Sequence, residues 1–337
     1  MINYIYQLVS PQIFSVKYSD VSNQNVIVRP KYMSICHADQ RYYLGKRDLK
    51  ILRKKLPMAL IHECCGEVLH DPSGTYKIGQ KVVLIPNVPP EVAKKDIYEN
   101  YGKGSKFLSS GYDGFMREIV DINVDRVVPF ENIENKIACI CEFVSVGVHA
   151  INRLKINSHC HKDTIGIWGD GSLAYVVATA LSYKFPESKI IVVGRDERKL
   201  SQFSFVYRTY LSDNIPKDLE IDHAFECAGG EGSYYAIDDI IKYINPQGTV
   251  MLMGVSENKV GINTRDVLEK GLTLIGSSRS GRQDFIEAVN IMEKSEFQNR
   301  LRTIIFEDSP VENIKDIHRV FANDLNTQFK TVFKWNV

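Results

Sequence analysis

The stretch TIGIWGDGSLAYVVATALSYKFPESKIIVVG, residues 164–194, contains the pattern strand, tight turn, helix, strand. The apolar runs TIGIW and KIIVVG are typical of strands buried on both faces, and LAYVVATALSY between them predicts a helix. A strand, a crossover helix and a second strand form a βαβ unit, in which the two strands are parallel. The stretch therefore predicts a doubly wound α/β domain of the Rossmann type.

The turn after the first strand has the pattern GxGxxA, residues 169–174. Gly169 permits the tight turn, Gly171 lets the backbone approach a pyrophosphate, and a small sixth residue allows the helix to pack closely on the strand. The phosphates then lie at the helix N-terminus. We therefore expect Gly169, Gly171, Ser172 and Leu173 to bind a dinucleotide.

The end of the second strand predicts which nicotinamide cofactor is used. An acidic residue there would bond the ribose 2′-hydroxyl of NAD, but this chain has Gly194 followed by Arg195. A guanidinium can hold a 2′-phosphate with paired, charge-assisted hydrogen bonds. Arg198 and Lys199 either assist or are solvated charges at a helix start. The pattern favours NADPH over NADH.

The sequence after residue 194 continues this α/β domain, whereas the sequence before residue 164 predicts a different, β-rich domain. Strand-like runs continue at 222–229, 248–254 and 272–277, the last after the helix-like NTRDVLEK. The N-terminal part instead has short β-rich runs such as VIVRP and KVVLIP between turn residues. We expect a Rossmann domain over 146–285 and a β-rich catalytic domain over 1–145 and 286–337, the tail containing a helix, DFIEAVNIMEK, and a final strand, FKTVFKW.

Composition and charge exclude several function classes. The 42 Lys and Arg balance 41 Asp and Glu, so no basic field favours nucleic acid or an anionic membrane. The N-terminus lacks the features of a secretory signal, and no apolar stretch is long enough to span a bilayer. Seven cysteines at irregular spacing suit reduced thiols or metal ligands better than disulfides. We expect a cytoplasmic protein that binds neither nucleic acid nor membrane.

Two segments of the β-rich part contain potential metal ligands. Cys36 follows the apolar Met33–Ile35, and His62-Glu63 opens an otherwise apolar run. A thiolate, an imidazole and a carboxylate suit a tetrahedral zinc with one open position. Taken singly, Cys36 also fits a small buried apolar residue, and His62 a hydrogen-bonded core residue.

These residues and several motifs together resemble the zinc-containing medium-chain alcohol dehydrogenases. The resemblance runs from Cys36 and Asp39 through HECCG at 62–66, GQKV at 79–82 and GYDGFMRE at 111–118 to FECAGG at 225–230. It implies a β-rich GroES-like catalytic domain beside the Rossmann domain. The run EFVSVGVHA at 142–150 is similar to the polyol branch, where a glutamate replaces the third cysteine ligand.

By that resemblance one catalytic zinc is held by Cys36, His62 and Glu142, with Glu63 as a close ligand or its exchange partner. Asp39 is expected to orient His62 through the imidazole nitrogen that does not face the metal. These five residues are our expected catalytic set.

The chain departs from the family pattern at three places. Ala38 stands where a serine or threonine commonly relays the proton, so the proton must take another path, through metal-bound water with Glu63 or Glu142. Ile61 replaces the glycine before His62, which adds bulk without removing a ligand. Residues 87–110 contain no cysteine, so we expect no structural zinc there.

Within the family the chain most resembles the bacterial ribulose-5-phosphate reductases. The resemblance rests on CHADQRYY at 36–43, Glu142, the lack of structural-zinc cysteines in residues 87–110, and the turn that favours NADPH. It implies reduction of D-ribulose 5-phosphate to D-ribitol 5-phosphate for CDP-ribitol, used in teichoic acid or capsule synthesis, with a cytidylyltransferase as a possible partner. We also expect a homodimer. Arg41 and Tyr42 are our preferred substrate residues, since arginine suits phosphate. Other cations in loops that could face the substrate are Lys46, Arg47, Lys103, Lys106, Arg279 and Arg282.

Two other hypotheses remain open. An unphosphorylated-polyol dehydrogenase has the same metal ligands, but its usual preference for NAD conflicts with Gly194-Arg195. A non-catalytic nucleotide-binding relative would be expected to lack Cys36, His62 or the acidic residues, and all are present.

Overall fold

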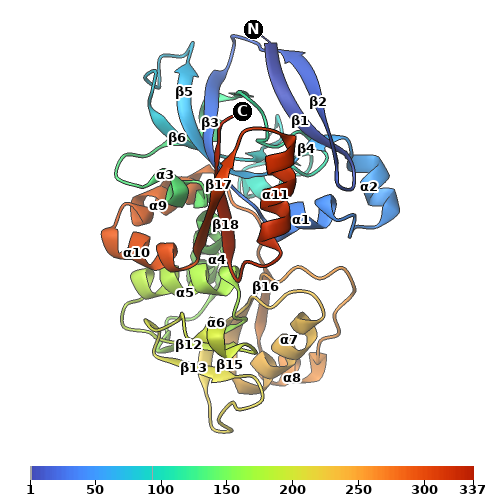
Figure 1. Ribbon diagram of the computed structural model, residues 1–337. Coiled ribbons are helices and arrows are strands. Elements are labelled where there is room, and N and C mark those ends of the chain that lie inside the picture. The colour runs from blue at the N-terminus through green and yellow to red at the C-terminus, as the bar shows by residue number, and fades with distance from the viewer. Residues whose placement is uncertain (1, 93) are drawn as a thin grey trace. The chain divides into compact units, whose positions relative to one another are not determined.

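The structure, a computed structural model, describes residues 2–92 and 94–337 (Figure 1). The chain forms two compact units: unit 1, Met1–Ser145 with Arg279–Val337, and unit 2, Val146–Ser278. The chain returns from unit 2 to unit 1 between Ser278 and Arg279, seven residues before the boundary expected at 285/286. The reason is the helix α9, Arg282–Met292, which packs on the strand β10, Val127–Pro129, within unit 1.

Unit 2 is built on a six-stranded sheet in which every neighbouring pair is parallel, in the order β13-β12-β11-β14-β15-β16. Counted from β11, this is the order 3-2-1-4-5-6 of a dinucleotide-binding domain, so the expected Rossmann fold is confirmed. The strands are β11 (Thr164–Trp168), β12 (Lys189–Gly194), β13 (Arg208–Leu211), β14 (Ile221–Glu226), β15 (Ile244–Leu252) and β16 (Thr273–Gly276).

One strand of this sheet was not expected. The sequence of β13, RTYL, has no apolar run, and none of its residues is fully buried. It joins the sheet at an edge, where only one side of a strand needs a partner, so neither composition nor period marks it as a strand.

The helices of unit 2 connect the strands. In α5 the residues 174–181 are all buried, which fits a helix that is apolar on every side. In α7 the buried residues Ala236, Ile237, Ile240 and Ile241 form a single stripe. The helices are α4 (Cys141–Asn157, which begins in unit 1), α5 (Ser172–Lys184), α6 (Glu197–Leu200), α7 (Gly232–Tyr243) and α8 (Thr264–Glu269).

Unit 1 contains a seven-stranded sheet in the order β10-β6-β5-β3-β18-β17, with β9 also paired to β3. A three-stranded sheet, β2-β1-β4, and the hairpin β7-β8 complete it. The strands are β1 (Ile2–Ser10), β2 (Ile13–Asp20), β3 (Val26–Ser34), β4 (Met58–Ala59), β5 (Glu63–His70), β6 (Lys81–Leu84), β7 (Asn87–Val88), β8 (Lys106–Phe107), β9 (Val120–Ile122), β17 (Ile305–Val311) and β18 (Lys330–Trp335).

The pairing of β3 decides which segments meet at its end. Ser34 on β3 lies opposite Glu63 on β5, and on its other side opposite Val332 on β18. The residues just after Ser34 therefore lie beside the start of β5 and the start of the C-terminal strand. The predicted return of FKTVFKW to the first domain is confirmed.

Helices cover this framework. The helix α1 begins directly after Cys36, and α11 places Ile317, Val320 and Phe321 in the apolar core of the unit. The remaining helices are α1 (His37–Tyr43), α2 (Leu49–Lys55), α3 (Asn135–Ala138), α10 (Ser295–Thr303) and α11 (Ile314–Asp324), with the short 3₁₀ turns η1 (Glu99–Tyr101) and η2 (Val124–Arg126). Within the described residues, none of the helices has the length and apolarity that crossing a bilayer requires.

Candidate active site

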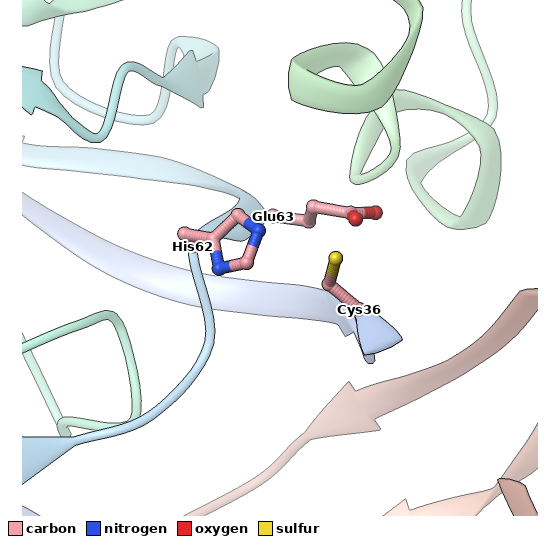
Figure 2. Close-up of side chains that lie close together, drawn as sticks. All are labelled: Cys36, His62 and Glu63. Carbon is pink, nitrogen blue, oxygen red and sulfur yellow. The ribbon is translucent and has the colours of Figure 1, made fainter. Parts of the chain in front are cut away.

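The first group of functional side chains lies where β3, β5 and α1 meet. Cys36 is the residue before α1, and His62-Glu63 leads into β5. The Cys36 thiol, the His62 imidazole and the Glu63 carboxylate place one ligand atom each within 4.8 Å of one another (Figure 2). His62 and Glu63 are buried and Cys36 is half-buried. We call these three residues the metal pocket.

Asp39 contacts the residues of this pocket and fixes their positions. Its buried carboxylate accepts hydrogen bonds from the backbone N–H of Cys36 (3.2 Å) and of Ile61 (3.0 Å). It also lies 3.4 Å from Nδ1 of His62. Nδ1 thus faces the carboxylate, which leaves Nε2 of the ring for a ligand; this arrangement is consistent with the predicted role of Asp39.

Ser109 is a partner that the sequence did not predict. Its hydroxyl donates to Asp39 Oδ1 at 2.7 Å and lies 3.3 Å from His62 Nδ1. Its φ of 64° is in the left-handed region, which is uncommon for serine. The contact joins residues 70 positions apart, so no local pattern could have shown it.

Ile61 has a larger role than added bulk. Its φ is 70°, a conformation that a β-branched residue rarely adopts, whereas the glycine that it replaces would adopt it freely. The strain persists because the Ile61 N–H donates to Asp39 and its carbonyl accepts from the N–H of Phe115 at 2.8 Å. The same conformation directs the next residue, His62, into the pocket.

Lys330, at the start of β18, is a second residue that the sequence did not predict. Its buried ammonium donates to Glu63 Oε1 at 2.7 Å and to the carbonyl of Ile35 at 2.9 Å. Burial lowers the pKa of Lys330, but the negative charges of Glu63 and Cys36 outweigh this effect and raise it overall. Lys330 therefore stays protonated and fixes one oxygen of Glu63.

Glu142, in the first turn of α4, lies near the pocket but outside the group of converging ligand atoms. Burial, and then the charge of Glu63, raises its pKa to about 7, although His62 and Lys330 act in the opposite direction. Glu63 rather than Glu142 thus completes the close group.

The residues of the pocket fit a zinc ion. Thiolate, imidazole and carboxylate are donors that zinc takes in proteins. Oε2 of Glu63 is buried and has no hydrogen-bond partner among the described residues, which is costly unless a cation or donor satisfies it. Burial lowers the pKa of His62, but Asp39 and Cys36 raise it well above its ordinary value, so the pocket concentrates negative charge.

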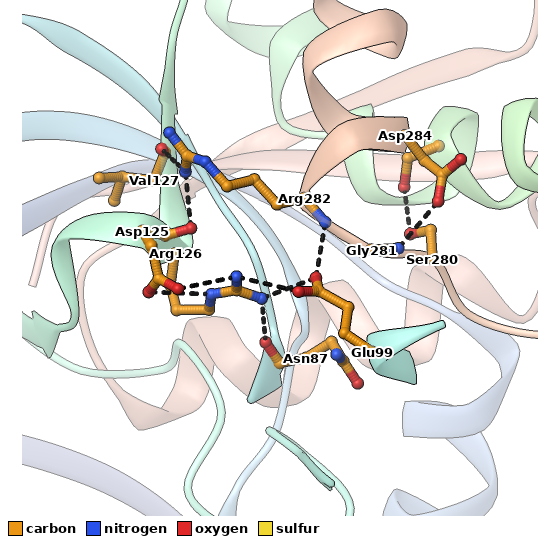
Figure 3. Close-up of polar contacts among 10 residues, drawn as sticks. Asn87, Glu99, Asp125, Arg126, Val127, Ser280, Gly281, Arg282 and Asp284 are labelled. Carbon is orange, nitrogen blue, oxygen red and sulfur yellow. Dashed lines mark hydrogen bonds and ion pairs between the residues drawn. The ribbon is translucent and has the colours of Figure 1, made fainter. Parts of the chain in front are cut away.

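The lobe at 87–110 is joined to the rest of unit 1 by an ion pair. Glu99 accepts from both terminal nitrogens of Arg126, at 2.9 and 3.2 Å, and from the backbone N–H of Arg282 at 2.6 Å (Figure 3). Arg126 also donates to the carbonyl of Asn87 at 3.1 Å. A bidentate Arg–Glu contact with low exposure of the arginine is a strong form of this interaction.

The cofactor turn of unit 2 has the expected backbone. Gly169 has a φ of 135°, and a Cβ there would lie 2.9 Å from the backbone of Cys227. At Gly171 a Cβ would meet nothing within 4 Å, so the space beside it is open. Ser172 and Leu173 form the start of α5, whose N–H groups can receive a pyrophosphate.

The residues predicted to select NADPH lie on an exposed turn that Asp170 holds. The Asp170 carboxylate accepts from the N–H of Arg195 at 2.6 Å and of Asp196 at 2.8 Å. A Cβ at Gly194 would lie 2.6 Å from that of Asp170, which explains the glycine. Arg198 and Lys199 lie in the first turn of α6, which Asp196 caps.

The predicted substrate pair lies on α1. Tyr42 is buried, its hydroxyl accepts from Lys55 Nζ at 3.0 Å, and Arg47 lies 4.8 Å from the centre of its ring. Arg41 is half-buried in the last turn of α1. Cations therefore surround Tyr42, and its own hydroxyl is already bonded within the protein.

Comparisons with known proteins agree with this geometry. Residues 22–132 match the alcohol dehydrogenase GroES-like domain, and residues 174–294 match the zinc-binding dehydrogenase domain. A ribulose-5-phosphate reductase of Streptococcus pneumoniae is 58% identical over 100% of this chain and 98% of its own length. Ribulose-5-phosphate reductase 1 of Staphylococcus aureus is 50% identical over 99% of each chain. The crystal structure of S. aureus TarJ in complex with NADPH superposes with a TM-score of 0.89 at 45% identity, covering 100% of both chains.

The chain therefore belongs to the zinc-binding alcohol dehydrogenase family, with GroES-like and Rossmann-type domains. Among its members it is similar over its whole length to ribulose-5-phosphate reductases. The expected fold and family resemblance are confirmed.

Proposed function

We propose that the chain reduces D-ribulose 5-phosphate to D-ribitol 5-phosphate with NADPH. The observation that carries the proposal is the intact metal pocket in a chain that is 58% identical to a ribulose-5-phosphate reductase over its full length. A relative that had lost its chemistry would have no reason to retain converging Cys36, His62 and Glu63.

In this proposal Cys36 and His62 hold zinc, with Glu63 or Glu142 as the carboxylate ligand. Bound zinc supplies a Lewis acid that polarises the ketone carbonyl, and NADPH supplies the hydride. Asp39 keeps the His62 ring in its orientation, and Lys330 limits the movement of Glu63 because it holds Oε1.

Reduction of a ketone also consumes a proton. Ala38 has no hydroxyl to relay one, so in this proposal the proton path uses one of the buried carboxyl groups at the pocket, Glu63 or Glu142. A carboxyl group can act as a general acid when its surroundings favour the protonated form.

In unit 2 the turn with Gly169, Gly171, Ser172 and Leu173 binds the pyrophosphate of NADPH. Arg195 takes the 2′-phosphate, with Arg198 and Lys199 beside it. Support comes from the open space at Gly171, the exposed Arg195, and the NADPH complex of the similar S. aureus protein.

The product is a polyol phosphate suited to activation by a cytidylyltransferase, which would supply CDP-ribitol for teichoic acid or capsule. We propose that the enzyme is cytoplasmic, since its seven cysteines are free thiols. We also propose that it acts as a homodimer. The strand β16 ends the sheet of unit 2, and a second copy can extend such an edge.

The test compares D-ribulose 5-phosphate with D-ribulose as substrates in the presence of NADPH. We expect a much higher kcat/KM for the phosphate ester, because binding energy from the phosphate positions the carbonyl. Equal kcat/KM values would favour an unphosphorylated-polyol dehydrogenase. No oxidation of NADPH with either ketose would favour a non-catalytic nucleotide-binding protein.

A further inference from the structure

Arg279 begins the second segment of unit 1, and its guanidinium lies close to the metal pocket. Its central carbon is 4.8 Å from the centre of the Phe107 ring, and that ring is 5.3 Å from the imidazole of His62. The charges that act on Arg279 include the carboxylate of Glu142 and the phenol of Tyr42. The ring of Phe107 therefore lies between the guanidinium of Arg279 and the imidazole of His62, in contact with both.

Within the part of the chain that the structure describes, the guanidinium of Arg279 has no hydrogen-bond or ion-pair partner. Its contact is the face of Phe107. The side chain is half-buried, and burial lowers its pKa. A partly desolvated guanidinium with unused N–H donors is costly unless an anion satisfies it.

The backbone presents Arg279 in a strained conformation. Its φ is 59°, in the left-handed region that a non-glycine residue seldom adopts. The following residues are fixed. Ser280 shares a 2.6 Å hydrogen bond with Ser145. The Gly281 N–H donates to the Asp284 carboxylate at 2.9 Å (Figure 3). Strain of this kind persists where the surroundings over-determine it, and it is common at ligand-binding positions.

The neighbouring cations are engaged in holding the fold. Arg282 donates to the carbonyls of Asp125 at 2.6 Å and Val127 at 2.7 Å (Figure 3). Lys55 donates to the hydroxyls of Tyr42 at 3.0 Å and Ser110 at 2.8 Å. Arg282 therefore bonds its own segment to the strand β10 and the turn before it, whereas the N–H donors of Arg279 are available to a ligand.

We propose that Arg279 binds the phosphate group of the substrate. The planar guanidinium can give two parallel hydrogen bonds to a phosphate, while Phe107 supports its other face. Arg279 and His62 are linked by contacts of 4.8 and 5.3 Å to the centre of the Phe107 ring. We infer that the carbon chain of the substrate spans this separation, with its carbonyl at the pocket and its phosphate at Arg279. The inference rests on the proposed function for the identity of the ester, and it assigns the phosphate to Arg279 rather than to Arg41.

The experiment compares Arg279→Gln with Arg279→Lys, Arg41→Gln and a control, Lys17→Gln, which changes an exposed cation on the strand β2. For each, kcat/KM is measured with D-ribulose 5-phosphate and with D-ribulose, and zinc content and NADPH affinity are measured separately. In Arg279→Gln we expect kcat/KM for the phosphate ester to fall about tenfold to a hundredfold more than for ribulose. Arg279→Lys should recover part of this loss, and Lys17→Gln should match the wild type.

Calorimetry with inorganic phosphate and with D-ribitol 5-phosphate gives a readout that is independent of turnover. We expect both to bind the wild type and to bind Arg279→Gln at least about tenfold more weakly. Equal loss on both ketoses, an unchanged preference for the phosphate ester, or a larger loss in Arg41→Gln would overturn the assignment. If the wild type itself shows no preference for the phosphate ester, the proposed function fails, and the phosphate calorimetry still decides whether Arg279 binds an anion.

Discussion

The metal pocket of unit 1 and the cofactor turn of unit 2 are built in opposite ways. The side chains that form and support the metal pocket come from distant parts of the chain, since Ser109 and Lys330 bond to Asp39 and Glu63. Most of these side chains are buried. The cofactor turn lies almost wholly within residues 169–199, and the charges at its end are exposed. Damage to the pocket should therefore be severe and cooperative, whereas damage to the turn should be graded.

The largest expected effect is the loss of a metal ligand. Cys36→Ser or His62→Ala should abolish turnover and lower the zinc content of the purified protein, because each removes one of the converging donors. NADPH affinity, measured by fluorescence titration, should stay the same, since the turn lies in the other unit. Cys160→Ser, at an exposed thiol, is the matched control. Activity retained in the zinc-free variants contradicts a metal role.

Lys330→Met tests whether the buried carboxylate of Glu63 needs the ammonium of Lys330 as its partner. Removing one partner of a buried ion pair typically costs about 3–5 kcal/mol, because the other charge is left uncompensated. We expect a fall of this order in the free energy of unfolding from urea denaturation of the metal-free protein. Lys334→Met, on the exposed side of the same strand, should change little. An unchanged unfolding midpoint in Lys330→Met would show that Glu63 does not depend on it.

The same contrast explains which parts of the site could be predicted. Gly169, Gly171 and Arg195 could be proposed from the sequence because the residues that define the cofactor turn are close together in the chain. Lys330 lies 267 residues from its partner Glu63, and neither residue has a flanking motif that connects them. The turn was also incompletely predicted, since Asp170 occupies a variable position of GxGxxA, and only the structure shows its bonds to residues 195 and 196.

Arg195→Ala tests the graded response of the cofactor turn. The loss of a hydrogen bond to a charged group is worth about 1.5–3 kcal/mol, so the affinity for NADPH should fall about tenfold to a hundredfold. The affinity for NADH, which lacks the 2′-phosphate, should hardly change. If the ratio of the two affinities is unaltered, the 2′-phosphate is bound by Arg198 or Lys199 instead.

Each unit has a buried histidine, and the pKa values of the two are shifted in opposite directions. His62 has negatively charged neighbours that raise its pKa, whereas burial and the charges of His159 and Lys162 lower the pKa of His223 to about 4. Between pH 6.5 and 4 the unfolded chain binds a proton that folded His223 does not. The free energy of unfolding should therefore fall as the pH falls through this window.

His223→Asn should remove this part of the pH dependence, since asparagine can still accept the hydrogen bond that the Thr249 N–H donates to Nδ1 of His223. Relative to the variant, the wild type should lose about 1 kcal/mol of stability between pH 7.5 and 5.5. Urea denaturation at the two pH values measures this difference. His70→Asn, at an exposed histidine, is the control, and parallel pH profiles for wild type and His223→Asn would refute the assignment.

The most direct test of the proposed function is to identify the product that the zinc-loaded enzyme forms from D-ribulose 5-phosphate and NADPH. We expect one ribitol 5-phosphate for each NADPH oxidised, measured by NMR and by absorbance at the nicotinamide band, with little reaction when NADH replaces NADPH. Formation of another polyol phosphate, a preference for NADH, or faster reduction of unphosphorylated ribulose would contradict it.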